Sequence, residues 1–272
     1  MVLALVLTFY VADRELVFFE ENQIVSPDVS LGPVIAYFFG VVLLLALVLF
    51  FIPLRMLRQV FRVLFALMFG WGMFIVTALS LSTVPAYVLA VIAGVAWLFW
   101  ARVWLHDLLL LVALAGAGSV FGFLFSPLTF MIFMLIIAVY DVVAVRFGFM
   151  VWMADKMSDS DTLPAFIFPK QIRDWKMGLR SVRVGDLRNK ESAEREYSIL
   201  GGGDIGFPLM LAVSVFFKAG LGGAAIVGVF ALVGLMGAFL VQLLWLKDKP
   251  VPALPPIAFA SLVGFLITEL AF

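Results

Sequence analysis

The chain alternates long apolar runs with short polar stretches. Most of these runs are long enough to cross a bilayer as helices, which need about 20 residues. Lipid offers no partner for backbone N–H and C=O groups, and the runs lack the alternating polarity of β-barrel strands. The pattern therefore predicts an all-α, polytopic membrane protein with nine transmembrane helices, in segments 1–12, 32–53, 63–81, 84–101, 106–124, 128–149, 199–217, 221–246 and 251–272.

The first segment, 1–12, is too short for a full span, so we expect a first helix that is short or lacks its natural beginning. The longest polar stretch mixes charges of both signs and separates six apolar segments from three. It predicts a partly flexible cytoplasmic loop, 154–198, between an N-terminal six-helix part, 1–153, and a C-terminal three-helix part, 199–272. This loop is either a plain solvated linker or a regulatory or substrate-contacting segment.

Basic residues predict the orientation in the membrane. If the N-terminus is cytoplasmic and the spans alternate, sixteen Lys and Arg residues fall in cytoplasmic loops, and only Arg14 and Lys218 fall outside. Cytoplasmic loops carry an excess of Lys and Arg. We therefore expect a multi-pass protein of the cell membrane, with its N-terminus in the cytoplasm and its C-terminus outside.

Composition narrows the chemistry. The chain is 65% hydrophobic and 13% charged, with zero formal net charge. These values predict the lipid bilayer as its surroundings and argue against a nucleic-acid partner. The absence of cysteine excludes disulfides and thiol catalysis, and the single histidine excludes an H-E-x-x-H zinc site. No metal and no cofactor are expected.

Two aspartates, Asp141 and Asp204, stand in otherwise apolar runs. A carboxylate at membrane depth costs about 3 kcal/mol even on the mildest insertion scale, so each is a candidate functional residue. Counted from Phe149 and Ile199 at about 1.5 Å per residue, they lie about 12 and 7.5 Å from the cytoplasmic helix ends. Both should lie in the cytoplasmic half of the bilayer, on two antiparallel helices that can bring them face to face.

Two carboxylates a few ångströms apart in a medium of low dielectric share one proton, because both cannot ionise. Such a pair supplies a general base, which draws a proton from water, and a general acid, which protonates a peptide carbonyl. The titration belongs to the pair, so the sequence does not assign the proton to either residue. This chemistry is that of an aspartic protease.

The flanks of both aspartates suit this chemistry. Gly201, Gly202 and Gly203 weaken the start of the seventh helix and leave room for a substrate backbone. Tyr140 precedes Asp141, and adjacent helical residues point about 100° apart, so its ring should shape the pocket wall rather than bond to the aspartate.

The last helix is preceded by Pro252, Ala253 and Leu254, and two further prolines follow. These prolines should prevent a regular helix and leave carbonyls unpaired. One interpretation is an irregular segment that binds an extended peptide by strand addition. The other is a plain proline-rich start of the last helix.

Together these motifs resemble the Y-D, G-x-G-D and P-A-L signatures of presenilins and signal peptide peptidases, in the same order and over essentially the whole chain. The basic cytoplasmic loops match presenilins, since signal peptide peptidases have the inverted orientation. The small size resembles an archaeal presenilin homologue. In presenilins, the position of Gly202 commonly carries leucine, so this chain departs from the pattern there.

The resemblance implies an intramembrane aspartic endopeptidase that hydrolyses peptide bonds within transmembrane segments of protein substrates. It implies that Asp141 and Asp204 are the catalytic pair and that the three motifs shape the site and bind the substrate. It implies a nine-helix, presenilin-like fold. Presenilin itself works with partner subunits, but nothing in this sequence requires accessory subunits.

Two other functions compete with this interpretation. A proton- or cation-coupled transporter also uses intramembrane carboxylates and broken helices, but six plus three spans show no inverted halves. A serine protease needs a G-x-S-G setting, and no glycine follows Ser119. We expect His106, at a cytoplasmic helix end beside Asp107, to be solvated or to cap the helix. Trp97, with its neighbouring tryptophans, resembles an interfacial anchor.

Overall fold

The structure is a computed structural model that describes residues 1–27, 29–185, 195–244 and 251–271. In chain order its elements are α1 (Val2–Glu21), α2 (Leu31–Phe51), α3 (Leu54–Ala78), α4 (Thr83–Phe99), α5 (Val103–Leu124), α6 (Pro127–Arg146), α7 (Phe149–Asp159), β1 (Ala165–Pro169), η1 (Ile172–Lys176), η2 (Leu179–Ser181), β2 (Tyr197–Gly201), α9 (Gly202–Leu244) and α10 (Leu254–Ala271).

In the part of the chain that the structure describes, each of the nine apolar segments predicted from the sequence is mainly helical, which confirms the helical membrane fold. Six described helices are long and apolar enough to cross a membrane, and α4 is a shorter apolar helix. The seventh and eighth segments form the two halves of α9, which reverses direction at Gly220 (φ 71°, ψ −173°). Glycine is required at this reversal because residues with a Cβ rarely adopt a positive φ.

The first helix is longer than expected, because α1 continues past the apolar segment 1–12 as far as Glu21. Asp13 and Arg14 point outward and are exposed, whereas Glu15 is buried and accepts a 2.9 Å hydrogen bond from the Ser119 hydroxyl of α5. Helix α1 thus continues through its charged residues and packs against α5 and α9. The expectation of a short first helix was wrong.

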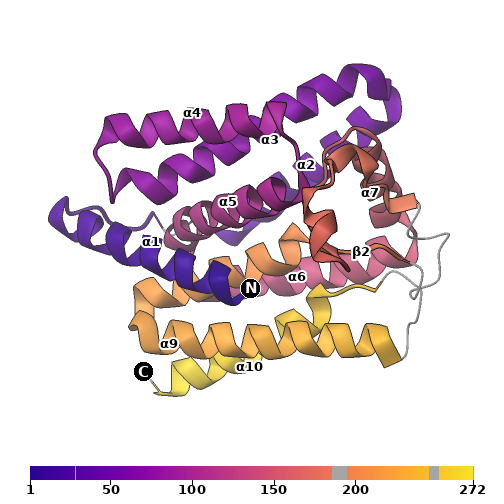
Figure 1. The fold of residues 1–272 in the computed structure, drawn as a ribbon. Coiled ribbons are helices and arrows are strands. Elements are labelled where there is room, and N and C mark those ends of the chain that lie inside the picture. Colours follow the sequence, from indigo (N-terminus) through magenta and orange to yellow (C-terminus); the bar gives the residue numbers. More distant parts are fainter. Residues whose placement is uncertain (28, 186–194, 245–250, 272) are drawn as a thin grey trace.

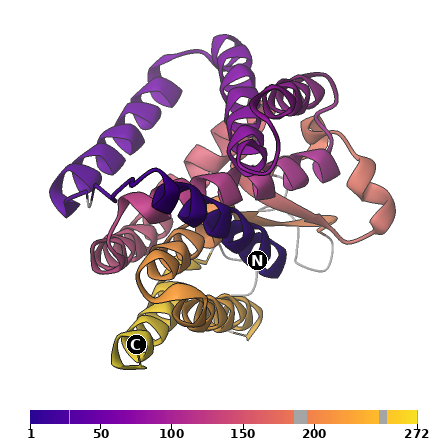
Figure 2. The same ribbon diagram turned by 90° about the vertical axis from the view of Figure 1, so that its left-hand side faces the viewer.

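Helix α5 lies inside the bundle, where it contacts α1, α3 and α9. Twelve of its residues are buried, whereas α2, the most apolar helix, buries only Leu49. Figure 2 shows α2 at the edge of the bundle, set apart from the helices around α5. An apolar helix at the periphery is suited to contact lipid, and the enclosed α5 is suited to hold polar side chains.

The predicted flexible loop contains ordered elements in its described part. Helix α7 turns away from α6, and β1 pairs antiparallel with β2 in the register Ala165↔Gly201 to Pro169↔Tyr197. Both strands are rich in aromatic and β-branched residues, which favour strands. Residues 186–194 of this loop lie outside the described residues, and the domain boundaries at 153 and 198 remain predictions.

Candidate active site

Asp141 lies in the last turns of α6, whose start is fixed by Ser126, since the Ser126 hydroxyl accepts a hydrogen bond from the Thr129 N–H. The Asp141 side chain is buried, with 6% of its surface exposed. Its Oδ2 accepts a 3.2 Å hydrogen bond from the backbone N–H of Leu254. The candidate base or acid on α6 is therefore held by the first residue of α10.

The proline-rich segment explains this contact. Helix α10 begins at Leu254, so Pro255 and Pro256 occupy its first turn and do not prevent a regular helix, contrary to the sequence prediction. Proline is tolerated there because the first N–H groups of a helix have no intrahelical partner. The Leu254 N–H remains as a donor at the positive end of the helix dipole, which is a favourable place for a carboxylate. Since this donor is already used, strand addition at this N–H does not fit the structure.

Asp204 is the third residue of α9, which begins at Gly202 rather than at Ile199. The depth of 7.5 Å counted from Ile199 was therefore wrong, because Tyr197–Gly201 form strand β2 and not helix. The Asp204 side chain is half-buried, and the backbone of Gly201 lies close to its carboxyl group. The second carboxylate thus sits at a junction between a strand and a helix.

The glycines before Asp204 permit close contacts. A Cβ on Gly201 would lie 3.0 Å from Oδ2 of Asp204, and a Cβ on Gly202 would lie 2.9 Å from the backbone oxygen of Pro164. A Cβ on Gly203 would meet the Phe207 ring at 3.2 Å. Glycine at 202, where presenilins commonly carry leucine, is explained by the approach of the β1 end to the start of α9.

The structure brings together the three motifs found in the sequence. Helix α6 contacts both α9 and α10. The Asp141 carboxyl group lies close enough to that of Asp204 to act on it electrostatically. With the bond to Leu254, this places both aspartates and the start of α10 in one site, whereas Pro252 and Ala253 form the irregular backbone that leads into it.

Tyr140 lies beside this site without bonding to Asp141. Its ring packs edge-on against Phe39 of α2, with ring centroids 5.4 Å apart, and against Phe38. Its hydroxyl oxygen is buried and has no hydrogen-bond partner among the described residues. The ring therefore forms part of the wall between α6 and α2, as its position in the sequence predicted.

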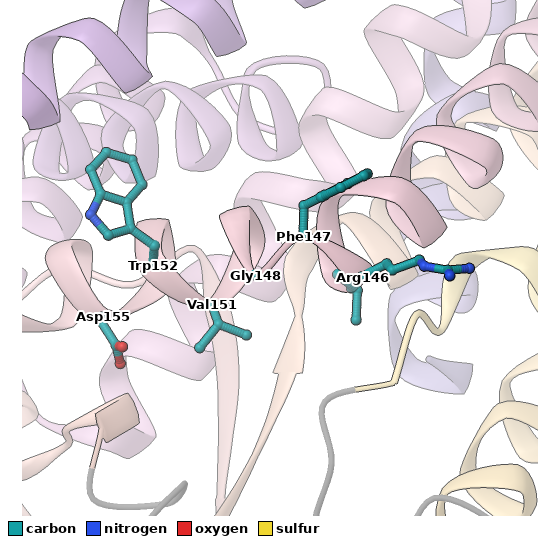
Figure 3. A pocket seen from close by; sticks show the side chains of 7 residues that line it. Arg146, Phe147, Gly148, Val151, Trp152 and Asp155 are labelled. Carbon is teal, nitrogen blue, oxygen red and sulfur yellow. The ribbon is translucent and has the colours of Figure 1, made fainter.

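A separate open hollow of about 440 Å³ lies where α6 turns into α7 (Figure 3). Neither aspartate lines it, so it is distinct from the site of the three motifs. Its lining residues are Val145, Arg146, Phe147, Gly148, Val151, Trp152 and Asp155.

Two polar residues of α5 have a role that the sequence did not indicate. His106 is fully buried and not solvated, which corrects the expectation, and Asp107 is 7% exposed. Both contact strand β1, which the sequence analysis did not predict. Trp97 is also fully buried against His106 and is not an interfacial anchor. In the described part of the chain, no three His, Cys, Asp or Glu side chains form a group that could hold a metal ion.

Comparison with protein families gives a match over residues 1–272 to the family described as signal-peptide peptidase, presenilin aspartyl protease. The chain belongs to this family. The protein is an intramembrane aspartyl protease, as the motifs predicted, and nothing in the comparisons supports the transporter alternative.

Two solved structures of a presenilin family intramembrane aspartate protease share the fold. The one in space group C222 has a TM-score of 0.61 at 20% identity, and covers 97% of this chain and 94% of its own. The one in space group P2 has a TM-score of 0.63 at 20% identity, with 99% and 96% covered. A comparison with curated protein sequences found no match. The presenilin-like fold of this protease is therefore confirmed.

Proposed function

We propose that Asp141 and Asp204 are the catalytic pair and that this protease hydrolyses peptide bonds within transmembrane segments of its substrates. The observation that supports this most directly is that the two carboxyl groups lie near each other where α6 contacts α9 and α10. A carboxylate at membrane depth is costly, and the bond from Leu254 to Asp141 does not account for a second carboxyl group beside it.

The reaction follows from one shared proton. The ionised carboxylate takes a proton from a water molecule, and the resulting hydroxide attacks the scissile carbonyl carbon. The protonated carboxyl group gives its proton to the carbonyl oxygen, which yields a neutral gem-diol. On collapse of this intermediate, the carboxylate that has become ionised takes a proton from one hydroxyl of the gem-diol as the C=O bond re-forms and the C–N bond breaks. The leaving nitrogen receives a proton from the carboxyl group that took it from water. The pair ends with one proton, as it began.

Strand β2 supplies a backbone edge next to this pair. The N–H of Lys170 donates to Glu196 and the N–H of Gly202 donates to Pro164, across the hairpin. In an antiparallel pair of strands, hydrogen-bonded residue pairs alternate with pairs that are not hydrogen-bonded. Ile199 therefore belongs to a pair that is not hydrogen-bonded, and its backbone N–H and C=O face away from β1. Among the described residues, no hydrogen bond reaches the backbone of Ile199 from that side. An unwound substrate segment can add to this edge as a strand and run toward Asp204.

The proposed orientation places this site near the cytoplasm. The hairpin and α7 lie at one end of the bundle, and the C-terminus lies at the other (Figure 1). The excess of basic residues in the loops at the hairpin end supports a cytoplasmic N-terminus and an external C-terminus in the cell membrane. The counted Lys247 and Lys249 lie outside the described residues. The site is built from one chain, so we propose that accessory subunits are not required.

The test is cleavage of a single-span reporter by the purified protein in detergent. Asn at either position keeps the shape but cannot exchange a proton, so Asp141→Asn and Asp204→Asn should each lower kcat by about a thousandfold or more. Asp13→Asn, which changes an exposed aspartate of α1, is the matched control and should cleave like wild type. Mass spectrometry of the products should place the cut inside the apolar segment. Cleavage within tenfold of wild type by either variant would refute the proposal.

A further inference from the structure

Two buried polar side chains of α5 have no part in the proposed reaction. His106 and Asp107 lie near the start of the helix that the rest of the bundle encloses, and both are at least nine-tenths buried. Burying a polar group is costly unless it is hydrogen-bonded. Their partners therefore indicate what they do.

Both side chains bond to the backbone of strand β1. The Ile167 N–H donates to Asp107, at 3.1 Å from Oδ1 and 3.4 Å from Oδ2. Nε2 of His106 lies 3.2 Å from the Ala165 carbonyl oxygen. These two backbone groups face away from β2, because residues 165 and 167 lie between the hydrogen-bonded pairs of the hairpin. The side chains of α5 thus cover the edge where a third strand would pair.

The third contact fixes the protonation of His106. The Trp97 Nε1–H lies 3.3 Å from Nδ1 of His106, and an indole nitrogen can only donate. Nδ1 must therefore accept, which leaves the hydrogen on Nε2, where it is donated to Ala165. The ring is neutral and held in one tautomer by α4 on one side and β1 on the other.

The covered strand is joined directly to the catalytic segment. The last residue before β1, Pro164, accepts a 2.9 Å hydrogen bond from the N–H of Gly202, two residues before Asp204. Strand β2, which pairs with β1, runs straight into Gly202. A shift of β1 therefore moves both β2 and the start of α9.

We infer that His106 and Asp107 are positioning residues of the protease, which fix the outer edge of β1 on α5 and thereby hold β2 and Asp204 opposite Asp141. This inference rests on the proposed function of the two aspartates. Loss of the two bonds should displace the hairpin, and a misplacement of about 1 Å can cost about a hundredfold in rate.

The first measurement is hydrogen exchange of the purified protein without substrate, which does not depend on proteolysis. Asp107→Leu removes the acceptor for Ile167, whereas Asp107→Asn keeps a side-chain oxygen that can accept the same bond. We expect Asp107→Leu to lower the protection of hairpin peptides over 165–169 and 197–201 by about tenfold or more. Asp107→Asn should stay close to wild type.

The matched control is Ser119→Ala, which removes another buried hydrogen bond of the same helix, about 18 Å along α5 from Asp107. It should lower stability without changing exchange in the hairpin. If Ser119→Ala exposes the hairpin as much as Asp107→Leu does, the two α5 residues have only a general structural role and the inference is wrong.

The second measurement is cleavage of the reporter. Asp107→Leu should lower kcat/KM by about tenfold to a hundredfold, and Asp107→Asn should restore it to within about threefold of wild type. The double variant His106→Phe with Asp107→Leu should lose little more than the worse single variant, because both act on one strand edge. Multiplied losses would contradict the inference.

A third readout uses the fact that His106 is the only histidine of the chain. In protein labelled with ¹⁵N-histidine, NMR should show a single neutral ring with hydrogen on Nε2, and Trp97→Phe should disturb it. Hydrogen on Nδ1 would overturn the assignment. If exchange and NMR follow the inference but wild type cleaves no reporter, the proposed function fails while the attachment of β1 to α5 stands.

Discussion

The two aspartates of the site are held in different ways. Asp141 belongs to a continuous helix, is buried, and is fixed from outside by the first N–H of α10. Asp204 belongs to the first turn of α9, is half-buried, and is fixed by the glycine backbone before it and by the hairpin that leads into it.

Because the two aspartates are held by different elements, the reaction can be disturbed at either aspartate separately. Changes at the start of α10 should act through Asp141 and leave the hairpin intact. Changes in the hairpin or in the glycines should act through Asp204 and leave the bond to Leu254 intact. The position of Asp204 can therefore change with the junction between β2 and α9, while Asp141 stays in place on α6.

Among changes outside the two aspartates themselves, the largest effect is expected at Gly202, on the Asp204 side. Gly202→Leu introduces the residue common in presenilins, but its Cβ would lie 2.9 Å from the Pro164 oxygen, so the β1 end must move. We expect kcat/KM to fall by about a hundredfold, because the start of α9 carries Asp204. Cleavage of the reporter measures this loss.

Gly237→Leu is the control in the same helix, since a Cβ there would meet nothing within 4 Å. It should cleave nearly as well as wild type. Full activity of Gly202→Leu would mean that the contact with Pro164 does not constrain Asp204.

A smaller effect is expected on the Asp141 side, at Leu254. Leu254→Pro removes the N–H that bonds to Asp141, at a helix position where proline is well tolerated. Leu254→Ala keeps the N–H and removes the buried side chain instead. Since a hydrogen bond to a charged group contributes about 1.5–3 kcal/mol, kcat of the proline variant should be about tenfold to a hundredfold below that of the alanine variant.

Hydrogen exchange distinguishes the effect of Leu254 on Asp141 from the effect of Gly202 on Asp204. Leu254→Pro should leave protection of the hairpin unchanged, whereas Gly202→Leu should reduce it. Equal kcat values for the proline and alanine variants would show that the bond to Asp141 has no catalytic importance.

The smallest effect is expected at Tyr140, where stability and activity should change in opposite directions. Its buried hydroxyl has no partner among the described residues, so Tyr140→Phe should leave the thermal midpoint equal or higher. If the hydroxyl meets substrate beside Asp141, kcat/KM falls by about threefold to tenfold. A clear loss of stability would contradict this reading and indicate a hydrogen bond within the protein.

Much of the fold could be predicted from apolar run lengths, because lipid leaves helices as the only option for such segments. The two aspartates could be found because carboxylates are rare at membrane depth. The hairpin could not, since short apolar segments such as Ile199–Gly201 resemble the helix that follows them. The start of α10 was misjudged because the position of a proline within the first turn decides whether it breaks a helix.

The polar residues of α5 show a further limit. Nothing in the sequence near His106 or Asp107 indicates burial, because their partners Ala165 and Ile167 lie far along the chain and bond through the backbone, which carries no sequence signal. The burial of Glu15 in α1 was also hidden, since its partner, the Ser119 side chain, lies far along the chain.

The measurement that tests the central claim most directly is reporter cleavage by Asp141→Asn, by Asp204→Asn and by the double variant. If the two carboxyl groups work as one unit, each single variant should fall to the same floor, about a thousandfold or more below wild type, and the double variant should fall no further. Cleavage within tenfold of wild type by either single variant, or multiplied losses in the double variant, would contradict the account.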